Sequence, residues 1–200
     1  MQEEIVGLVS ATRGHFLFES GHHGELWLEL DSLFVRPGDL ARPAEELSRR
    51  LAPHGVDAFC GPLSGGAFLA QALATRLDVE FFYAERSAPP QGDALFSAEY
   101  RVPGALRDRL RGTTVAIVDD VINAGSATRA TLADLRECGA RVIAVSALLT
   151  LGSAAAALAD AEGVALETLA NLPNSLWPPA ECPMCAAGAP LEPPPAGRAR

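Results

Sequence analysis

The sequence contains no lysine. All 16 of its basic residues are arginines, against 25 aspartates and glutamates, which gives a formal net charge of -9 at pH 7. A surface with this charge repels the phosphate backbone of nucleic acids and anionic membranes. The sequence therefore predicts no nucleic-acid partner. A site for a phosphorylated ligand has to obtain its positive field from backbone amides, arginine side chains or a metal ion.

Long apolar runs are also missing. A membrane-spanning helix needs about 20 predominantly apolar residues in succession, and no segment of this chain approaches that length. The chain starts with Gln2, Glu3 and Glu4 instead of the basic segment that opens a secretory signal. We therefore expect a soluble, cytoplasmic protein with no membrane partner.

Cysteine is scarce, with four in 200 residues, which is too few for a secreted disulfide scaffold. Cys60 and Cys138 lie in apolar segments and are expected to be buried thiols. Cys182 and Cys185 have the C-x-x-C spacing of one half of a zinc site. The other ligands of such a site would have to come from a histidine, another cysteine or a second chain. We favour the two simpler interpretations, a disulfide or two idle thiols, over Zn²⁺.

What the chain does have is a regular alternation of strand-like and helix-like segments. An alternation of this kind predicts an α/β fold with a mostly parallel central sheet and helices on both of its faces. The expected strands are Val56 to Cys60, Val79 to Tyr83, Thr114 to Val118, Val142 to Leu149 and Val164 to Leu169, and the expected helices are Pro43 to Leu51, Gly66 to Leu77, Ala127 to Cys138 and Ser153 to Asp160.

Other segments are less regular. Residues 3–12 have helical apolar spacing, residues 14–35 contain two short β-type runs around a turn, and residues 84–103 lack periodicity. We expect one phosphate-binding domain over residues 1–172, with a hood formed by 14–35 and 84–103. Residues 173–200 form a proline-rich, irregular tail with the C-x-x-C motif, which Trp177 anchors on the domain.

The strongest local signal is the run V-A-I-V-D-D-V-I-N-A-G-S-A from Val115 to Ala127. It places Asp119 and Asp120 at the end of an apolar strand, and open parallel sheets bind their ligands at the carboxyl ends of the strands. Two adjacent carboxylates can bind a vicinal diol, a divalent metal ion or both. The simpler alternative is that both aspartates cap a turn, and another is a phosphoacceptor site that binds magnesium.

A small polar loop follows the aspartates, formed by Asn123, Ala124, Gly125, Ser126 and Ala127. Gly125 permits close approach of the backbone to a ligand, and the next helix points its free amides at the loop. The amino-terminal end of a helix also carries the equivalent of about half a positive charge. The loop is therefore predicted to bind a phosphate group without a lysine. The alternative is an ordinary helix entry.

At these residues the sequence resembles the type I phosphoribosyltransferases, and the run V-D-D-V-I-N-A-G-S-A is most similar to the orotate phosphoribosyltransferase branch. The resemblance extends from about Phe18 to Leu149. It implies that Asp119 and Asp120 contact the ribose hydroxyls of 5-phosphoribosyl-1-pyrophosphate and that residues 123–127 bind its 5-phosphate. It also implies Mg²⁺ bound with the pyrophosphate, and a homodimer in which one subunit's loop covers its neighbour's site.

A second match to this family is C-G-P-L-S-G-G-A-F-L-A, which starts at Cys60. The family binds pyrophosphate through the backbone amides of a glycine-containing loop after its first core strand. The resemblance assigns this role to Gly61, Pro62, Leu63, Ser64, Gly65 and Gly66. Without the first match, the same residues are an ordinary turn between a strand and a helix.

The chain departs from the orotate enzymes at their charged positions. Their mobile loop is rich in lysine and histidine, whereas the corresponding run here is A-E-R-S-A-P-P-Q-G-D, with Arg86 as its only cation. Glu19 replaces a lysine of the family, Gly65 stands where a lysine can occur, and Leu151 replaces the arginine that recognises orotate. Orotate is therefore a poor candidate for the acceptor base.

Several other side chains are candidates for the hood. Arg86 and Arg101 could replace the missing lysines, because a guanidinium binds phosphate in a bidentate manner, although a solvated arginine is the simpler interpretation. Tyr100 could stack on a base or pack against the fold. His22 and His23 could meet the base or the pyrophosphate, and exposed turn histidines are the simpler alternative.

Taken together, the two motifs predict a transferase that moves the phosphoribosyl group of 5-phosphoribosyl-1-pyrophosphate to a nitrogenous base and releases pyrophosphate. The alternative from a different class is a binding protein that retains the ligand loop without catalysis.

Overall fold

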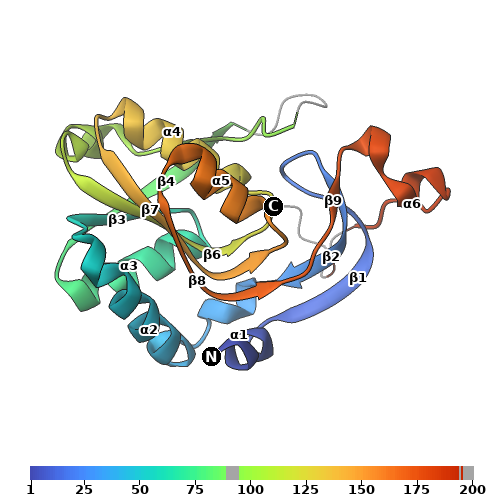
Figure 1. Cartoon of the computed structure of the whole chain (residues 1–200), viewed down its shortest axis with the longest axis horizontal. Helices are drawn as coiled ribbons and strands as arrows, with labels where there is room; N and C mark the ends of the chain where they lie inside the picture. Colours follow the sequence, from blue (N-terminus) through green and yellow to red (C-terminus); the bar gives the residue numbers. More distant parts are fainter. Residues whose placement is uncertain (89–94, 194, 196–200) are drawn as a thin grey trace.

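The computed structural model describes residues 1–88, 95–193 and 195, and it contains a six-stranded sheet with helices on both faces (Figure 1). The sheet has the order β5-β4-β3-β6-β7-β8, and all neighbouring strands are parallel except β4 and β5. The predicted α/β class is confirmed. The strands are β3 (Ala58–Pro62), β4 (Glu80–Ala88), β5 (Glu99–Arg101), β6 (Thr114–Ile122), β7 (Arg141–Leu151) and β8 (Ala165–Leu172).

Helices cover the sheet on two sides (Figure 1). On one face lie α2 (Ala41–Leu51) and α3 (Gly65–Leu77), and on the other lie α4 (Ser126–Glu137) and α5 (Ala154–Glu162). Short 3₁₀ helices connect the larger elements. They are η1 (Asp31–Phe34), η2 (Pro37–Leu40), η3 (Ala52–His54) and η4 (Gly104–Leu110).

Strand β6 lies in the interior of the sheet and is apolar on both faces. Ala116 and Val118 belong to the apolar cluster that includes α2 and α3, whereas Val115 and Ile117 belong to the cluster that includes α4. Successive side chains of a strand point to opposite faces, so a strand covered on both sides needs an uninterrupted apolar run. This is why the β6 sequence is apolar up to the aspartates.

The predicted end of this strand at Val118 was wrong. β6 continues through both aspartates to Ile122, because its ladder with β7 continues: Asp119 pairs with Ala147, and Ile122 pairs with Thr150. Asp119 and Asp120 therefore follow the alternation of the strand. This extension carries both carboxylates past the apolar core.

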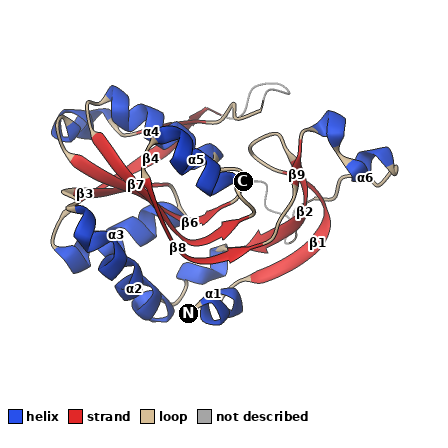
Figure 2. Cartoon of the chain, viewed as in Figure 1, coloured by secondary structure: helices blue, strands red, loops and turns tan. Residues whose placement is uncertain are grey.

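A second, antiparallel sheet stands beside the first (Figure 2). It has the order β1-β2-β9 and consists of β1 (Ser10–Leu17), β2 (His23–Glu29) and β9 (Leu176–Trp177). The tail after β9 continues through η5 (Pro179–Glu181) and α6 (Pro183–Ala186). The part of the tail from residue 176 to 186 thus has more regular structure than predicted, because β9 pairs with β2 and places Trp177 opposite His23.

Two further predictions need correction. Helix α1 (Gln2–Gly7) ends before the predicted helix 3–12 does, because Ser10 and Ala11 pair with Glu29 and Leu28 in the small sheet. The predicted loop 84–103 contains the end of β4 and the whole of β5, and residues 89–94 lie outside the described part of the chain. Among the described helices, none combines the length and apolarity that crossing a membrane requires.

Candidate functional site

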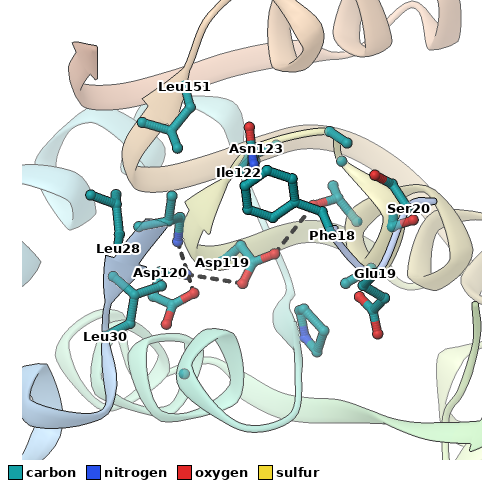
Figure 3. Close-up of a pocket in the computed structure, with 18 of the residues that line it drawn as sticks. Phe18, Glu19, Ser20, Leu28, Leu30, Asp119, Asp120, Ile122, Asn123 and Leu151 are labelled. Carbon is teal, nitrogen blue, oxygen red and sulfur yellow. Dashed lines mark hydrogen bonds between the residues drawn. The ribbon is translucent and has the colours of Figure 1, made fainter. Parts of the chain in front are cut away.

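A cavity of about 740 Å³ lies at the carboxyl end of β6, between the central sheet and the small sheet (Figure 3). It brings both predicted motifs together. The predicted residues that line it are Asp119, Asp120, Asn123, Ala124, Gly125, Ser126, Ala127, Pro62, Leu63, Ser64, Gly65, Arg86 and Tyr100. Of the other predicted residues, Gly61 and Gly66 pack closely against each other in the same loop, and Arg101 is not among the residues that line the cavity.

The aspartate pair is buried and held by hydrogen bonds. The Asp120 N–H donates to Asp119 Oδ1 at 3.0 Å, and the Thr128 hydroxyl donates to Asp119 Oδ2 at 3.3 Å. The Val121 N–H donates to Asp120 Oδ1 at 2.8 Å. Burial, and next the charge of Asp120, raise the pKa of Asp119 well above its usual value. A ligand that presents hydroxyl donors or positive charge to this pair relieves the repulsion between the carboxylates.

The loop before α3 packs directly against these carboxylates. A Cβ atom at Gly65 would lie 2.0 Å from Asp120 Oδ2, and one at Gly66 would lie 2.8 Å from Asp119 Oδ1. At Gly61 it would lie 2.2 Å from the Gly66 carbonyl oxygen. Glycine is therefore the residue that fits at all three positions, and a lysine at position 65 does not. The Leu63–Ser64 peptide bond in this loop is cis.

The loop after β6 ends at the start of α4. Gly125 precedes the helix with φ of 79°, a left-handed conformation that favours glycine. Among the described residues no side chain caps α4, and the buried Ser126 hydroxyl has no hydrogen-bond partner. The first turn of a helix has free N–H groups. These donors, together with the helix dipole, suit a phosphate group.

The tail supports this loop from outside. The Asn174 side-chain amide donates to Asn123 Oδ1 at 2.9 Å. Gly152 also approaches the same segment, because a Cβ atom there would lie 2.7 Å from the Asn174 carbonyl oxygen. The beginning of the tail is therefore part of the structure that positions the loop.

A charged network occupies one wall of the cavity. Arg86 Nη2 lies 3.0 Å from Glu19 Oε1, and the Tyr100 hydroxyl donates to the same oxygen at 3.1 Å. Burial, followed by the charge of Glu19, raises the pKa of Tyr100, which therefore remains a phenol at neutral pH. Glu19, at the position where the resemblance implies a lysine, thus binds Arg86, one of the two arginines considered as substitutes for the missing lysines.

Acidic groups outnumber cations around this cavity. Among the described residues that line it, four carry a carboxylate and Arg86 alone carries a permanent positive charge. The carboxylates belong to Asp119, Asp120, Glu19 and Glu192. Oxygen donors in an acidic pocket fit a divalent cation of the Mg²⁺ type, which binds through one or two carboxylates and substrate phosphates.

Arg101 and the two candidate histidines lie away from the cavity. Arg101 Nη1 pairs with Asp134 at 3.3 Å and with Glu137 at 3.1 Å. His22 packs against Phe96 with ring centroids 5.2 Å apart and the ring planes tilted by 60°. His23 is 6% exposed within β2, so the expectation of an exposed turn histidine was wrong for it.

The opposite end of the cavity is apolar. Figure 3 shows Leu28, Leu30 and Leu151 on one side of the aspartates, with Glu19 and Ser20 on the other. Leu28 of β2 and Leu30, which follows β2 directly, were not predicted as site residues, although Leu26, Leu28 and Leu30 alternate with other residues along this segment. Glu192 was also missed, because nothing in the sequence around it indicates that the tail returns to this cavity.

Comparisons with known proteins agree with this geometry. Residues 36–164 match the family described as "Phosphoribosyl transferase domain". The chain is 30% identical over 197 residues to an orotate phosphoribosyltransferase of Thermotoga maritima, covering 97% of each chain.

Solved structures of phosphoribosyltransferases also have folds similar to this one. An orotate phosphoribosyltransferase from Aeropyrum pernix superposes with a TM-score of 0.63 at 26% identity, over 83% of this chain and 89% of that one. An adenine phosphoribosyltransferase from Thermoanaerobacter pseudethanolicus is similar in fold, with a TM-score of 0.66 at 20% identity, over 86% of this chain and 100% of that one. The motifs, the fold and these relatives agree, and the chain belongs to the phosphoribosyltransferase family.

Proposed function

We propose that this phosphoribosyltransferase transfers the phosphoribosyl group of 5-phosphoribosyl-1-pyrophosphate to an uncharged nitrogenous base and releases pyrophosphate. The observation that carries the proposal is the position of Asp119 and Asp120, between two loops suited to phosphate groups, in one cavity. A ligand with a vicinal diol between two phosphorylated ends matches this order of groups.

Each part of the site has a separate task in the proposal. Asp119 and Asp120 accept hydrogen bonds from the ribose hydroxyls, and the amides at the start of α4 with the Ser126 hydroxyl hold the 5-phosphate. The loop 61–66 holds the pyrophosphate. In the reaction, the bond from ribose C1 to the pyrophosphate oxygen breaks, the bond from C1 to a base nitrogen forms, and the base loses one N–H proton to the solvent. Carboxylates beside the ribose stabilise the positive charge that develops on it.

The acidic character of the cavity supports Mg²⁺ as the accompanying cation. Glu19 pairs with Arg86, so the protein side chains that line the cavity in the described part of the chain do not offset the negative charge of the substrate. Bound with the substrate, Mg²⁺ supplies positive charge to the leaving pyrophosphate. Asp119 and Asp120 are the residues whose oxygen atoms suit it.

The apolar end of the cavity supports an uncharged acceptor. Leu28, Leu30 and Leu151 offer no partner for a carboxylate, and an unpaired anion in such surroundings is strongly disfavoured. Orotate carries a carboxylate, whereas uracil and the purine bases do not. The proposal therefore ranks uncharged bases above orotate, even though the relative from Thermotoga maritima is named for orotate.

The test is turnover with a panel of bases. The protein is incubated with 5-phosphoribosyl-1-pyrophosphate, Mg²⁺ and one base at a time, and pyrophosphate release is followed. We expect release with an uncharged base and slower release with orotate. If orotate were the best acceptor, the proposed preference for an uncharged base would be wrong, but the proposed phosphoribosyl transfer would stand. Thermal stabilisation by the donor without turnover on any base would instead support a binding protein.

A homodimer and a cytoplasmic location remain predictions. Leu63 and Phe68, which follow β3 in sequence, are 41% and 52% exposed, and apolar side chains at the surface near a site suit a subunit contact. Sedimentation velocity decides between monomer and dimer. A monomer at all concentrations would contradict the first prediction.

A further inference from the structure

Four potential metal ligands meet outside the cavity, between the small sheet and the tail. They are His15 of β1, His23 of β2, and Cys182 and Cys185 of the tail. Each contributes one ligand atom, and these atoms all lie within 4.8 Å of one another. His15, His23 and Cys182 are buried, whereas Cys185 is exposed. The half-site of the C-x-x-C motif thus gains two histidines that lie far away in the sequence.

The spacing of the ligand atoms matches a tetrahedral ion. His15 Nε2 lies 3.1 Å from His23 Nδ1 and 3.4 Å from Cys182 Sγ. Cys185 Sγ lies 3.7 Å from His15 Nε2 and 3.2 Å from His23 Nδ1. With Zn–N of about 2.0 to 2.1 Å and Zn–S of about 2.3 Å, a tetrahedral site places its ligand atoms about 3.3 to 3.8 Å apart. These four separations lie in or near this range.

The hydrogen bonds around the cluster orient one ligand. His15 Nδ1 lies 3.0 Å from the Ala189 carbonyl oxygen, which accepts a hydrogen bond. A proton on Nδ1 leaves the lone pair of Nε2 directed at the other three ligand atoms. Zinc-binding histidines usually have such a second partner, which fixes the tautomer and the ring orientation.

We propose that His15, His23, Cys182 and Cys185 bind one Zn²⁺ ion, which fastens the C-terminal tail to the small sheet. Two thiolates and two imidazoles in a tetrahedron are a ligand set that Zn²⁺ prefers in closed structural sites. Residues of one chain provide all four ligands, so no coordination position of the ion remains open for a substrate. The proposal does not depend on the reaction at the cavity.

The ion would also support one wall of the cavity. Beyond Cys185, the tail returns along β1, where the Glu192 N–H donates to the His15 carbonyl oxygen at 2.7 Å and Glu192 Oε1 accepts from the His15 N–H at 3.3 Å. Glu192 lines the cavity. His15 therefore contacts the proposed ion with its side chain and positions the cavity-lining segment with its backbone. Metal loss is expected to release this segment.

The test is metal analysis of the intact protein purified without chelators, followed by replacement with Co²⁺. We expect about one zinc per chain, as a closed four-ligand site requires. The Co²⁺ form should show absorption from thiolate-to-cobalt charge transfer. Removal of the metal should lower Tm by roughly 5 °C or more and should make the tail sensitive to protease.

Matched variants assign the ligands. His23→Ala and Cys182→Ser should lose the zinc, whereas His22→Ala and Cys138→Ser, which change the neighbouring histidine and a buried thiol outside the cluster, should retain it. If His23→Ala does not fold, Cys185→Ser at the exposed ligand gives the same readout. Zinc at background level after dialysis against Zn²⁺, equal zinc in His22→Ala and His23→Ala, or a Cys182–Cys185 disulfide in the purified protein would each overturn the proposal.

Discussion

A methyl group at position 65 is the smallest change that should damage the site. In Gly65→Ala the new Cβ atom would lie 2.0 Å from Asp120 Oδ2 and 2.6 Å from its Cγ, whereas real Cβ contacts essentially never fall below 3.0 Å. The carboxylate of Asp120 therefore has to move by at least 3.0 − 2.0 = 1.0 Å, or the loop has to move by the same amount. Asp120 has a short side chain, and its Oδ1 is held by the Val121 N–H at 2.8 Å.

The expected loss follows from this displacement. A misplacement of about 1 Å in a positioned group can lower the rate by about 100-fold, which corresponds to about 2.7 kcal/mol in the activation free energy. Overpacking should also lower the free energy of unfolding by about 1 to 3 kcal/mol. We therefore expect Gly65→Ala to remain folded, with kcat/KM reduced by about two orders of magnitude.

The assay is pyrophosphate release at several donor concentrations, paired with thermal unfolding. Gly104→Ala is the matched control, because a Cβ atom there meets nothing within 4 Å. It should leave both kcat/KM and Tm close to those of the unmodified protein. The reasoning fails if Gly65→Ala retains activity within about threefold of Gly104→Ala, because the loop would then not constrain Asp120.

The remaining predictions concern charge in the cavity. Because the pKa of Asp119 is raised in the folded state, the stability that this group contributes is present at low pH and is lost as pH rises above the ordinary aspartate value. Asp119→Asn should therefore abolish turnover and yet raise the free energy of unfolding at pH 7, by on the order of 1 kcal/mol. Denaturant melts should show no increase in the free energy of unfolding for this variant at low pH, and none at pH 7 for the exposed control Asp108→Asn. Arg86→Gln leaves Glu19 without its ion-pair partner and makes the cavity more negative, so it should raise the KM for the donor by about tenfold. Initial-rate kinetics of Arg101→Gln should show an unchanged KM, since Arg101 lies outside the cavity. Leu151→Arg places a cation at the apolar end of the cavity and should increase kcat/KM for orotate relative to uracil by at least about tenfold; an unchanged ratio in competition assays would show that Leu151 does not face the base.

The parallel sheet was predictable because its strands are covered on both faces and therefore read as apolar runs. The end of β6 was not, because polar residues normally end such a run, whereas Asp119 and Asp120 continue the ladder with β7 beyond the apolar core. The two phosphate loops were recognisable from glycines and small residues adjacent in sequence. Their packing against each other depends on the neighbouring positions of β3 and β6 in the sheet.

Only two of the four residues of the metal cluster, Cys182 and Cys185, could be recognised as candidate ligands from the sequence. The C-x-x-C spacing is local, but His15 is 167 residues from Cys182. The ladder of β1 and β2 has an irregularity between Arg13 and Phe16, the interval that contains His15, so the alternation of the strand does not by itself place His15 beside His23. Register of this kind is set by the turn and by tertiary packing. Two histidines around a hairpin, together with a distant C-x-x-C motif, were the available signal.

The most direct test of the central claim is a calorimetric titration of 5-phosphoribosyl-1-pyrophosphate with Mg²⁺ into the unmodified protein and into the variant Asp119→Asn, Asp120→Asn. We predict saturable binding of one donor molecule per chain in the unmodified protein, competition by ribose 5-phosphate, and at least tenfold weaker binding in the variant. Absence of binding to the unmodified protein, or equal affinity in both proteins, would contradict the account.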